Sequence, residues 1–149
     1  MSTEATLKHV IDSHNLVHIA TLDENGNPCV RGVDYASDEK MQLYFITFKT
    51  TRKVGQIENN QNISFVIDHD CPSMEELLKL KYVKGSGIAA EISDPAEAQK
   101  AIGLIMQKFP YLKNLPGEPS DFKVFKVQLK EVLVTDNTIS FGHTEAINL

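Results

Sequence analysis

The chain has 149 residues, a length typical of one domain, so we expect a single domain over residues 1–149. Its 42% hydrophobic and 23% charged residues are ordinary for a folded globular protein and exclude a disordered chain. The net charge of -5 argues against a nucleic acid as the main partner, because that binding usually rests on a broad basic surface.

The sequence also restricts where the chain can reside. It contains no run of about 18 apolar residues, so we expect no transmembrane helix and no membrane partner. The start, Met-Ser-Thr-Glu-Ala-Thr, has no basic segment followed by an apolar one, which predicts no signal peptide and a cytoplasmic location. Cys29 and Cys71 are expected to be free thiols. Adjacent ligand-type residues at 68–71 cannot all converge on one ion, so no metal site is predicted.

The first elements are predicted to be a helix and a hairpin. Apolar residues recur at helical spacing within residues 2–13, which indicates an amphipathic helix. A β-type run follows at 16–22, and the Asn-Gly pair at 25–26 is a strong hairpin signal. The strand over 29–35 should therefore return antiparallel to the first.

The next segment alternates a strand, a short helix and a strand. Residues 41–48 are predicted to be the third strand of a meander, and a helix should begin after Thr51. Residues 63–67 are nearly all apolar, which predicts a fourth strand buried on both faces.

The second half repeats this alternation. A helical turn or two is expected within 73–80, followed by a strand over 82–92 in which Gly85 and Gly87 predict a bulge or a close backbone approach. Ser-Asp-Pro-Ala-Glu at 93–97 is a helix start, and the apolar face that follows predicts a second long helix.

The end of the chain is predicted to be β-structure again. A Pro-rich ordered loop is expected at 109–119, a half-exposed strand over 122–134, and a last short strand at 138–141. Together the elements predict a mainly β fold, an antiparallel barrel with peripheral helices.

The junction between the third strand and its helix carries the most informative local pattern. Thr50 and Thr51 are N-cap candidates, and Arg52 and Lys53 lie in the first turn, where backbone N–H groups have no partner in the helix. The helix dipole disfavours a cation there by about 0.3–1 kcal/mol unless an anion binds as well. The pattern therefore predicts a bound phosphate or other anion. The alternative is that both cations are solvated surface residues.

Residues 45–53, Phe-Ile-Thr-Phe-Lys-Thr-Thr-Arg-Lys, together with the strand near 62–67, resemble the FMN-binding segment of the pyridoxamine 5'-phosphate oxidase-like split-barrel superfamily. The resemblance is to small members such as the general stress protein 26 and nitroimidazole-resistance groups. It implies a six-stranded antiparallel split β-barrel of Greek-key topology, a homodimer with sites at the interface, and FMN as cofactor. The chain has no Trp and no Arg near its end, so pyridoxamine phosphate oxidase activity itself is not expected.

The resemblance also implies roles for single residues. Thr47 would face the flavin or its ribityl chain, and the hydroxyl and basic residues after it would contact the phosphate, while the strand around Gly32 would approach the ring. The alternative for Arg31 is a salt bridge to Asp34 or another carboxylate. Aromatic residues at 44–48 could cover the ring or belong to the core. The cofactor-binding residues implied are Arg31, Gly32, Val33, Phe45, Ile46, Thr47, Thr51, Arg52 and Lys53.

The sequence thus predicts an FMN-binding flavoprotein, an oxidoreductase acting on an unidentified small molecule. Its catalytic residues are unknown, and no Ser/His/Asp or paired-carboxylate pattern supports hydrolysis. Two alternatives are a barrel that binds haem or a deazaflavin instead of FMN, and a cofactor-free dimeric interaction module.

Overall fold

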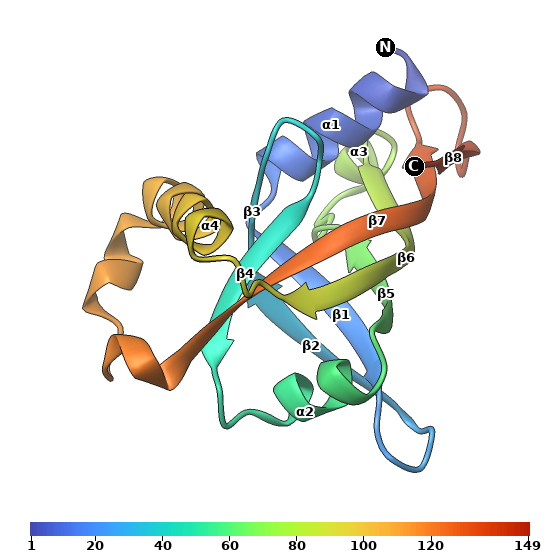
Figure 1. The fold of residues 1–149 in the computed structure, drawn as a ribbon. Coiled ribbons are helices and arrows are strands. Elements are labelled where there is room, and N and C mark those ends of the chain that lie inside the picture. The colour runs from blue at the N-terminus through green and yellow to red at the C-terminus, as the bar shows by residue number, and fades with distance from the viewer.

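A computed structural model describes all residues, 1–149, and shows one curled sheet of eight antiparallel strands with four α-helices around it (Figure 1). The strands pair in the order β2-β1-β5-β6-β7-β4-β3, and β8 pairs with β7. The strands are β1 (Leu16–Leu22), β2 (Pro28–Asp34), β3 (Ala36–Ser37), β4 (Leu43–Phe48), β5 (Asn62–Ile67), β6 (Lys81–Glu91), β7 (Phe122–Asp136) and β8 (Thr144–Asn148).

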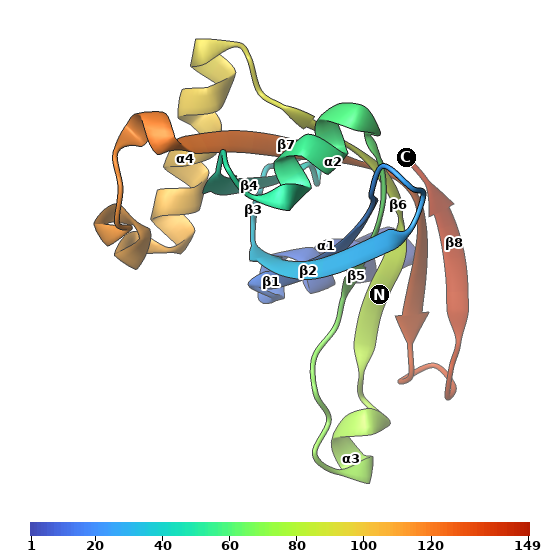
Figure 2. The same cartoon turned by 90° about the horizontal axis from the view of Figure 1, so that it is seen from below.

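The helices lie outside the sheet, as the sequence predicts. α1 and α3 lie at one end of the barrel and α2 at the other (Figure 1), while α4 stands on the outside of β4 (Figure 2). Two short 3₁₀ helices follow α4. The helices are α1 (Thr3–Ser13), α2 (Arg52–Asn59), α3 (Met74–Leu77), α4 (Pro95–Lys108), η1 (Pro110–Asn114) and η2 (Pro119–Asp121).

The barrel is closed at one end and open at the other. β2 pairs with β1 as far as Asp34, and one residue later the chain joins β4 through β3, where Ala36 pairs with Tyr44. Because β3 has only two residues, the rest of β4 has no partner on the side of β2. The two strands separate toward the end of the barrel at which α2 lies, which is the opening of a split barrel.

The predicted meander is wrong at its third strand. β4 pairs with β7 and β3 and makes no ladder with β2. Short connections favour hairpins, but α2 carries the chain across the barrel end and brings β5 to the free edge of β1. The pairing is therefore decided by distant segments.

The predicted last strand, residues 138–141, is also wrong. The chain turns there, because Asp136 accepts hydrogen bonds from the Thr138 N–H at 2.9 Å and from its hydroxyl, and Gly142 takes a left-handed conformation with φ 79°. The last strand begins at Thr144 and pairs back on β7. β3 was not predicted, so the sheet has eight strands where the resemblance implied six.

The prediction that residues 63–67 are buried on both faces is wrong as well. Ile63, Phe65 and Ile67 point into the core, whereas Ser64 is exposed and Val66 is half-buried on the outer face. One face of β5 therefore belongs to the molecular surface.

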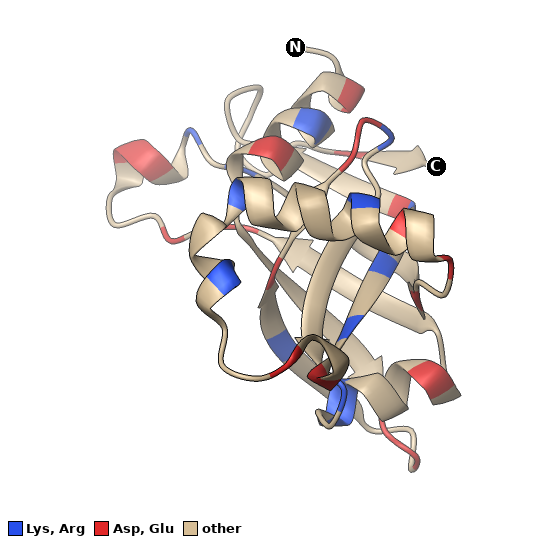
Figure 3. Ribbon diagram, turned by 60° about the vertical axis from the view of Figure 1, so that its left-hand side comes forward, with Lys and Arg blue, Asp and Glu red and all other residues tan.

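The barrel interior holds a core of 20 buried residues, and α1 closes one end with Leu7, Val10 and Ile11. A smaller cluster forms where Ala101 and Ile105 of α4 pack on the outside of the barrel. Acidic and basic residues are interspersed on the face seen in Figure 3. No helix has the length and apolar character required to cross a membrane.

Candidate functional site

The junction of β4 and α2 gathers a lysine and two hydroxyls. Lys53 Nζ donates to Thr47 Oγ1 at 2.8 Å and to Thr51 Oγ1 at 3.3 Å. No carboxylate lies within ion-pair distance of Lys53. Burial lowers the pKa of Lys53, and the nearby charge of Arg31 lowers it further. The Lys53 ammonium is half-buried, and only two neutral hydroxyl oxygens accept from it. Its positive charge is therefore not neutralised, and one N–H donor remains for an anion.

The N-terminus of α2 is not capped by a side chain. Thr51 is the N-cap residue, as predicted, but its hydroxyl accepts no hydrogen bond from the helix and instead donates to Phe48 O at 3.0 Å. The Val54 N–H donates to the Thr51 carbonyl oxygen at 3.2 Å, whereas the Arg52 and Lys53 N–H groups have no acceptor in the helix and none on the Thr51 side chain. They add to the positive potential beside Lys53.

Arg31 lies inside the barrel opening and forms no salt bridge with Asp34 or any other carboxylate. Nη1 donates to Thr21 Oγ1 at 2.7 Å, and Nη2 donates to Gln56 Oε1 at 2.9 Å. Burial lowers the pKa of Arg31, and the charge of Arg52 also acts to lower it. Asp34 instead accepts from the Tyr111 hydroxyl at 3.4 Å.

Gln56 and Thr21 are site residues that the sequence reasoning missed. Gln56 is only 9% exposed, and its Oε1 also accepts from the Thr21 hydroxyl at 2.6 Å. Its Nε2 donates to Cys29 Sγ at 3.6 Å. The sequence signal that could have identified Gln56 is its position as a polar residue beside Val54 and Ile57, on the buried face of a short helix. Together Thr21 and Gln56 fix the guanidinium of Arg31.

An apolar slot adjoins the lysine. It is a cavity of about 290 Å³ between β2, the free edge of β4 and the segment after α4. Its polar lining residues are Thr47, Thr51, Lys53 and the carboxylate of Asp34. Val33, on the predicted list, lines it together with Ile46. The hydrophobic residues of the slot are Val33, Ile46, Phe48, Leu112, Leu115 and Phe122.

The remaining predicted residues lie elsewhere. Phe45 is fully buried and stacks on Phe125 with ring centroids 5.3 Å apart, so its side chain belongs to the core, as does that of Tyr44. Gly32 is exposed on the outer face of β2. Arg52 is exposed and lines a separate cavity of about 410 Å³ beside Gln56. The structure therefore brings Arg31, Val33, Ile46, Thr47, Thr51 and Lys53 together around the barrel opening.

These residues fit the chemical parts of FMN. The lysine, the hydroxyls and the open helix start suit a phosphate, and the apolar slot suits a flat ring system. β2 is an edge strand, so backbone groups on its outer edge are free to bond the polar side of a ring. No group of three or more His, Cys, Asp or Glu side chains gathers where it could hold a metal.

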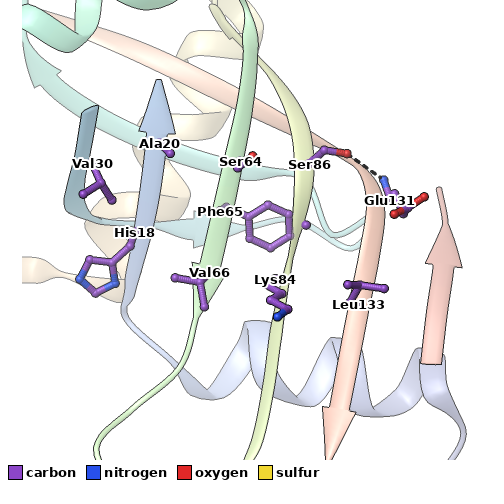
Figure 4. A pocket seen from close by; sticks show the side chains of 11 residues that line it. His18, Ala20, Val30, Ser64, Phe65, Val66, Lys84, Ser86, Glu131 and Leu133 are labelled. Carbon is purple, nitrogen blue, oxygen red and sulfur yellow. Dashed lines mark hydrogen bonds between the residues drawn. The ribbon is translucent and has the colours of Figure 1, made fainter. Parts of the chain in front are cut away.

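A second concavity lies on the outer face of the sheet, where β2, β1, β5, β6 and β7 run side by side (Figure 4). It has a volume of about 460 Å³. Val30 is 71% exposed at its margin, and His18 lies beside Val66. This outer sheet face is apolar in part and has no cover within the chain.

The sequence profile of the family described as Pyridoxamine 5'-phosphate oxidase matches residues 3–136. The chain belongs to this family. General stress protein 26 of Bacillus subtilis (strain 168), a relative among curated proteins, is 31% identical over 93 residues, which are 62% of this chain and 61% of that protein.

Solved structures agree with the family's fold. A heme binding protein from Mycobacterium smegmatis superposes with a TM-score of 0.82 at 17% identity, covering 99% of this chain and 58% of that one. HutZ, a heme storage protein from Vibrio cholerae, gives 0.69 at 19% identity, covering 87% and 92%. This chain thus spans less than two thirds of the length of the Bacillus and mycobacterial proteins. At these identities the structural matches establish the fold alone.

Proposed function

We propose that this family member is a homodimeric FMN-binding flavoprotein, an oxidoreductase that acts on a small molecule. The observation that carries the proposal is the position of Lys53. It lies between two threonine hydroxyls at an uncapped helix start, close enough to Arg31 for their charges to interact, and neither cation has a carboxylate partner. A phosphate monoester would neutralise this site.

In this proposal the chain holds and orients the cofactor, and FMN when bound supplies the electron or hydride transfer. Lys53, Thr47 and Thr51 hold the phosphate, and Arg52 adds positive charge from the exposed side of the same helix turn. Arg31, oriented by Thr21 and Gln56, offers its charge to the ring edge that becomes negative on reduction. The apolar slot excludes water from the ring.

The outer sheet face is the proposed dimer interface. It exposes Val30 and other apolar side chains on a broad, gently concave surface beside the edge strand β2. A second copy on this face would remove Val30 from water.

The test is FMN binding by the purified protein, followed by flavin fluorescence and by thermal unfolding. At a concentration about 100 times Kd, FMN should stabilise the native state by about 2.7 kcal/mol. Lys53→Ala should weaken binding at least tenfold, since a charge-assisted contact to the phosphate is lost. Lys49→Ala removes the same charge from an exposed residue that lines none of the cavities described and serves as the matched control. Equal FMN affinity of Lys53→Ala and wild type would rule out this clamp.

Haem is a second candidate, because His18 offers an imidazole in the apolar outer concavity and two proteins of the same fold are named for haem. Haem binding would give an intense Soret band that His18→Ala alters, whereas bound FMN gives a yellow protein. A deazaflavin, added in parallel, tests the same clamp with another ring. Absence of binding by all three would favour a cofactor-free dimer.

A further inference from the structure

A cavity lies at the end of the barrel away from α2. It has a volume of about 570 Å³ and is formed by the end of α1, the loop after β5, the approach to β6 and the turn after β7. His14 lies two residues before β1, whereas Thr21 of the flavin site is its second-last residue, so the two sites lie at opposite ends of one strand. Only one of its eight lining residues is hydrophobic. The polar side chains used below are Ser13, His14, His69, Lys79, Lys81 and Thr138, and we refer to this cavity as the histidine-lysine pocket.

A hydrogen-bonded histidine pair forms one wall of the pocket. His14 Nδ1 lies 2.8 Å from Val10 O, and because a carbonyl only accepts, this nitrogen carries the proton. In neutral His14 the other nitrogen, Nε2, must then accept, and His69 Nδ1 donates to it at 2.8 Å. His69 Nε2 then has no partner within the pair, and it is an acceptor in the neutral ring and a donor only in the imidazolium. The His69 ring is held in place across 55 residues of sequence.

The charges of the pocket favour an anion. No carboxylate is among the lining residues, whereas two lysines are. Lys81 forms no ion pair, and Lys79 pairs only with Glu75 at 3.2 Å, both side chains being well exposed. Two carboxylates lie nearby without lining the pocket: the charge of Asp68 acts on His14, and that of Asp136 acts on Lys81. Asp136 Oδ1 already accepts from the Thr138 N–H and hydroxyl. Two lysine ammonium groups would repel a metal cation, so the histidine pair is not read as a metal site.

We propose that the histidine-lysine pocket binds a phosphorylated small molecule through its phosphate. The ammonium groups of Lys79 and Lys81 are donors that complement a phosphate dianion, and His69 Nε2 adds a third donor when the His69 ring is protonated. The volume of the pocket exceeds that of a bare ion and lies in the range of small-molecule sites, roughly 300–1,000 Å³. The inference is independent of the flavin proposal, because the two sites share no residue.

The test is an NMR titration with sodium phosphate at constant ionic strength, in the Lys53→Ala variant so that the α2 end does not contribute. Backbone amide and imidazole signals of Ser13, His14, His69 and Thr138 should shift with a saturable dependence. Lys81→Gln in the same background should weaken binding about tenfold, the loss expected for one charge-assisted contact. Lys79→Gln, on an exposed side chain, is a second variant with the same expectation.

Lys84→Gln is the matched control, because Lys84 lies on the outer sheet face and should leave phosphate affinity unchanged. Ribose 5-phosphate binding tighter than phosphate would show that the rest of the cavity contributes, and equal affinity would show that the phosphoryl group alone is bound. The proposal is overturned if the signals do not saturate, if sodium chloride causes the same shifts, or if both lysine variants bind like their parent.

Discussion

Arg31 and Lys53 are two cations that the chain holds without a carboxylate. For Arg31 the cost is limited because Thr21 and Gln56 are themselves positioned by β1 and α2. A guanidinium needs several acceptors in a fixed geometry, and this pair of side chains supplies them before any ligand binds. The site is thus built to keep a positive charge inside the barrel opening.

Arg31→Met tests this preorganisation. Removal of hydrogen bonds from a partly buried charged group should lower the free energy of unfolding by about 1–2 kcal/mol, and FMN affinity should fall as well. Arg52→Met, on an exposed side chain, should change stability by less than about 0.5 kcal/mol. Urea unfolding of both variants gives the comparison, and equal effects would contradict the role of Thr21 and Gln56.

His14 should make stability depend on pH. Burial lowers the pKa of His14 below its ordinary value of 6.5, and the neighbouring His69 and His9 lower it further, against opposite effects from Val10 O and Asp68. Lys108 also lies close, since it donates to His14 O at 2.6 Å. The unfolded state then binds the proton more readily than the folded state.

The direction in which stability changes with pH follows from this difference in proton binding between the two states. Stability should be unaffected by His14 above pH 6.5 and should fall as the pH decreases from 6.5 toward the lower pKa of the folded state. Denaturant unfolding between pH 5 and 8 should therefore show a steeper acid loss in wild type than in His14→Gln. Parallel curves for the two proteins would mean that His14 is not the group responsible.

At the scale of elements, the starts of α4 and α2 differ in how they are capped. Asp94 accepts from the Glu97 N–H at 3.0 Å and is followed by Pro95, so α4 is capped for stability. The Thr51 hydroxyl leaves the start of α2 open. When no side chain caps a helix start, the first N–H groups remain available to a ligand.

Two cap variants separate these roles. Asp94→Ala should lower the free energy of unfolding by about 1 kcal/mol without changing FMN affinity. Thr51→Val, which keeps the shape of the side chain, should cost less stability and weaken FMN binding several-fold. Chemical unfolding and flavin fluorescence provide the two readouts, and the reverse pattern would contradict the assignment.

The elements with strong local patterns were predicted from the sequence. The helices at the N-terminus and after Ser93, the Asn-Gly hairpin and the strand-helix junction at Thr51 all occur, because each is encoded by contiguous residues. β3 was missed because two residues carry no periodicity. The strand expected at 138–141 failed because side-chain bonds to Asp136 outweigh its β propensity.

The site was predictable in part for the same reason. Thr47, Thr51 and Lys53 are close in sequence and meet in space. The sequence placed Phe45 and Arg52 with them, but strand alternation turns Phe45 into the core and helix geometry points Arg52 to the surface. Gln56 escaped notice because periodicity identifies the buried face of a helix through its apolar residues.

At the scale of the whole molecule, the sheet order depends on contacts between distant segments. β1 pairs with β5 and β4 with β7, and no local signal specifies either choice. The opening that holds Arg31 lies where β2 and β4 form no ladder with each other, because β3 covers only two residues of β4 and β2 pairs with β1 alone. The order of the strands therefore forms the barrel opening, and residues close in sequence supply the side chains that line it.

Val30→Glu tests the proposed dimer. A carboxylate on the outer sheet face should oppose association, because it would be buried without a partner. Sedimentation should give a dimer for wild type and a monomer for the variant. Glu131→Gln, a conservative change on the same face, should remain dimeric. A dimeric Val30→Glu protein would place the interface elsewhere.

The bulge between Gly85 and Gly87 restricts which residue this chain can carry at position 85. A β-carbon at residue 85 would lie 2.0 Å from the carbonyl oxygen of Glu131, on the neighbouring strand. The obstacle is main chain, so no rotamer change removes it. A side chain at residue 85 is therefore incompatible with the present register of β6 and β7, and any substitution there would force the two longest strands of this chain to pair differently.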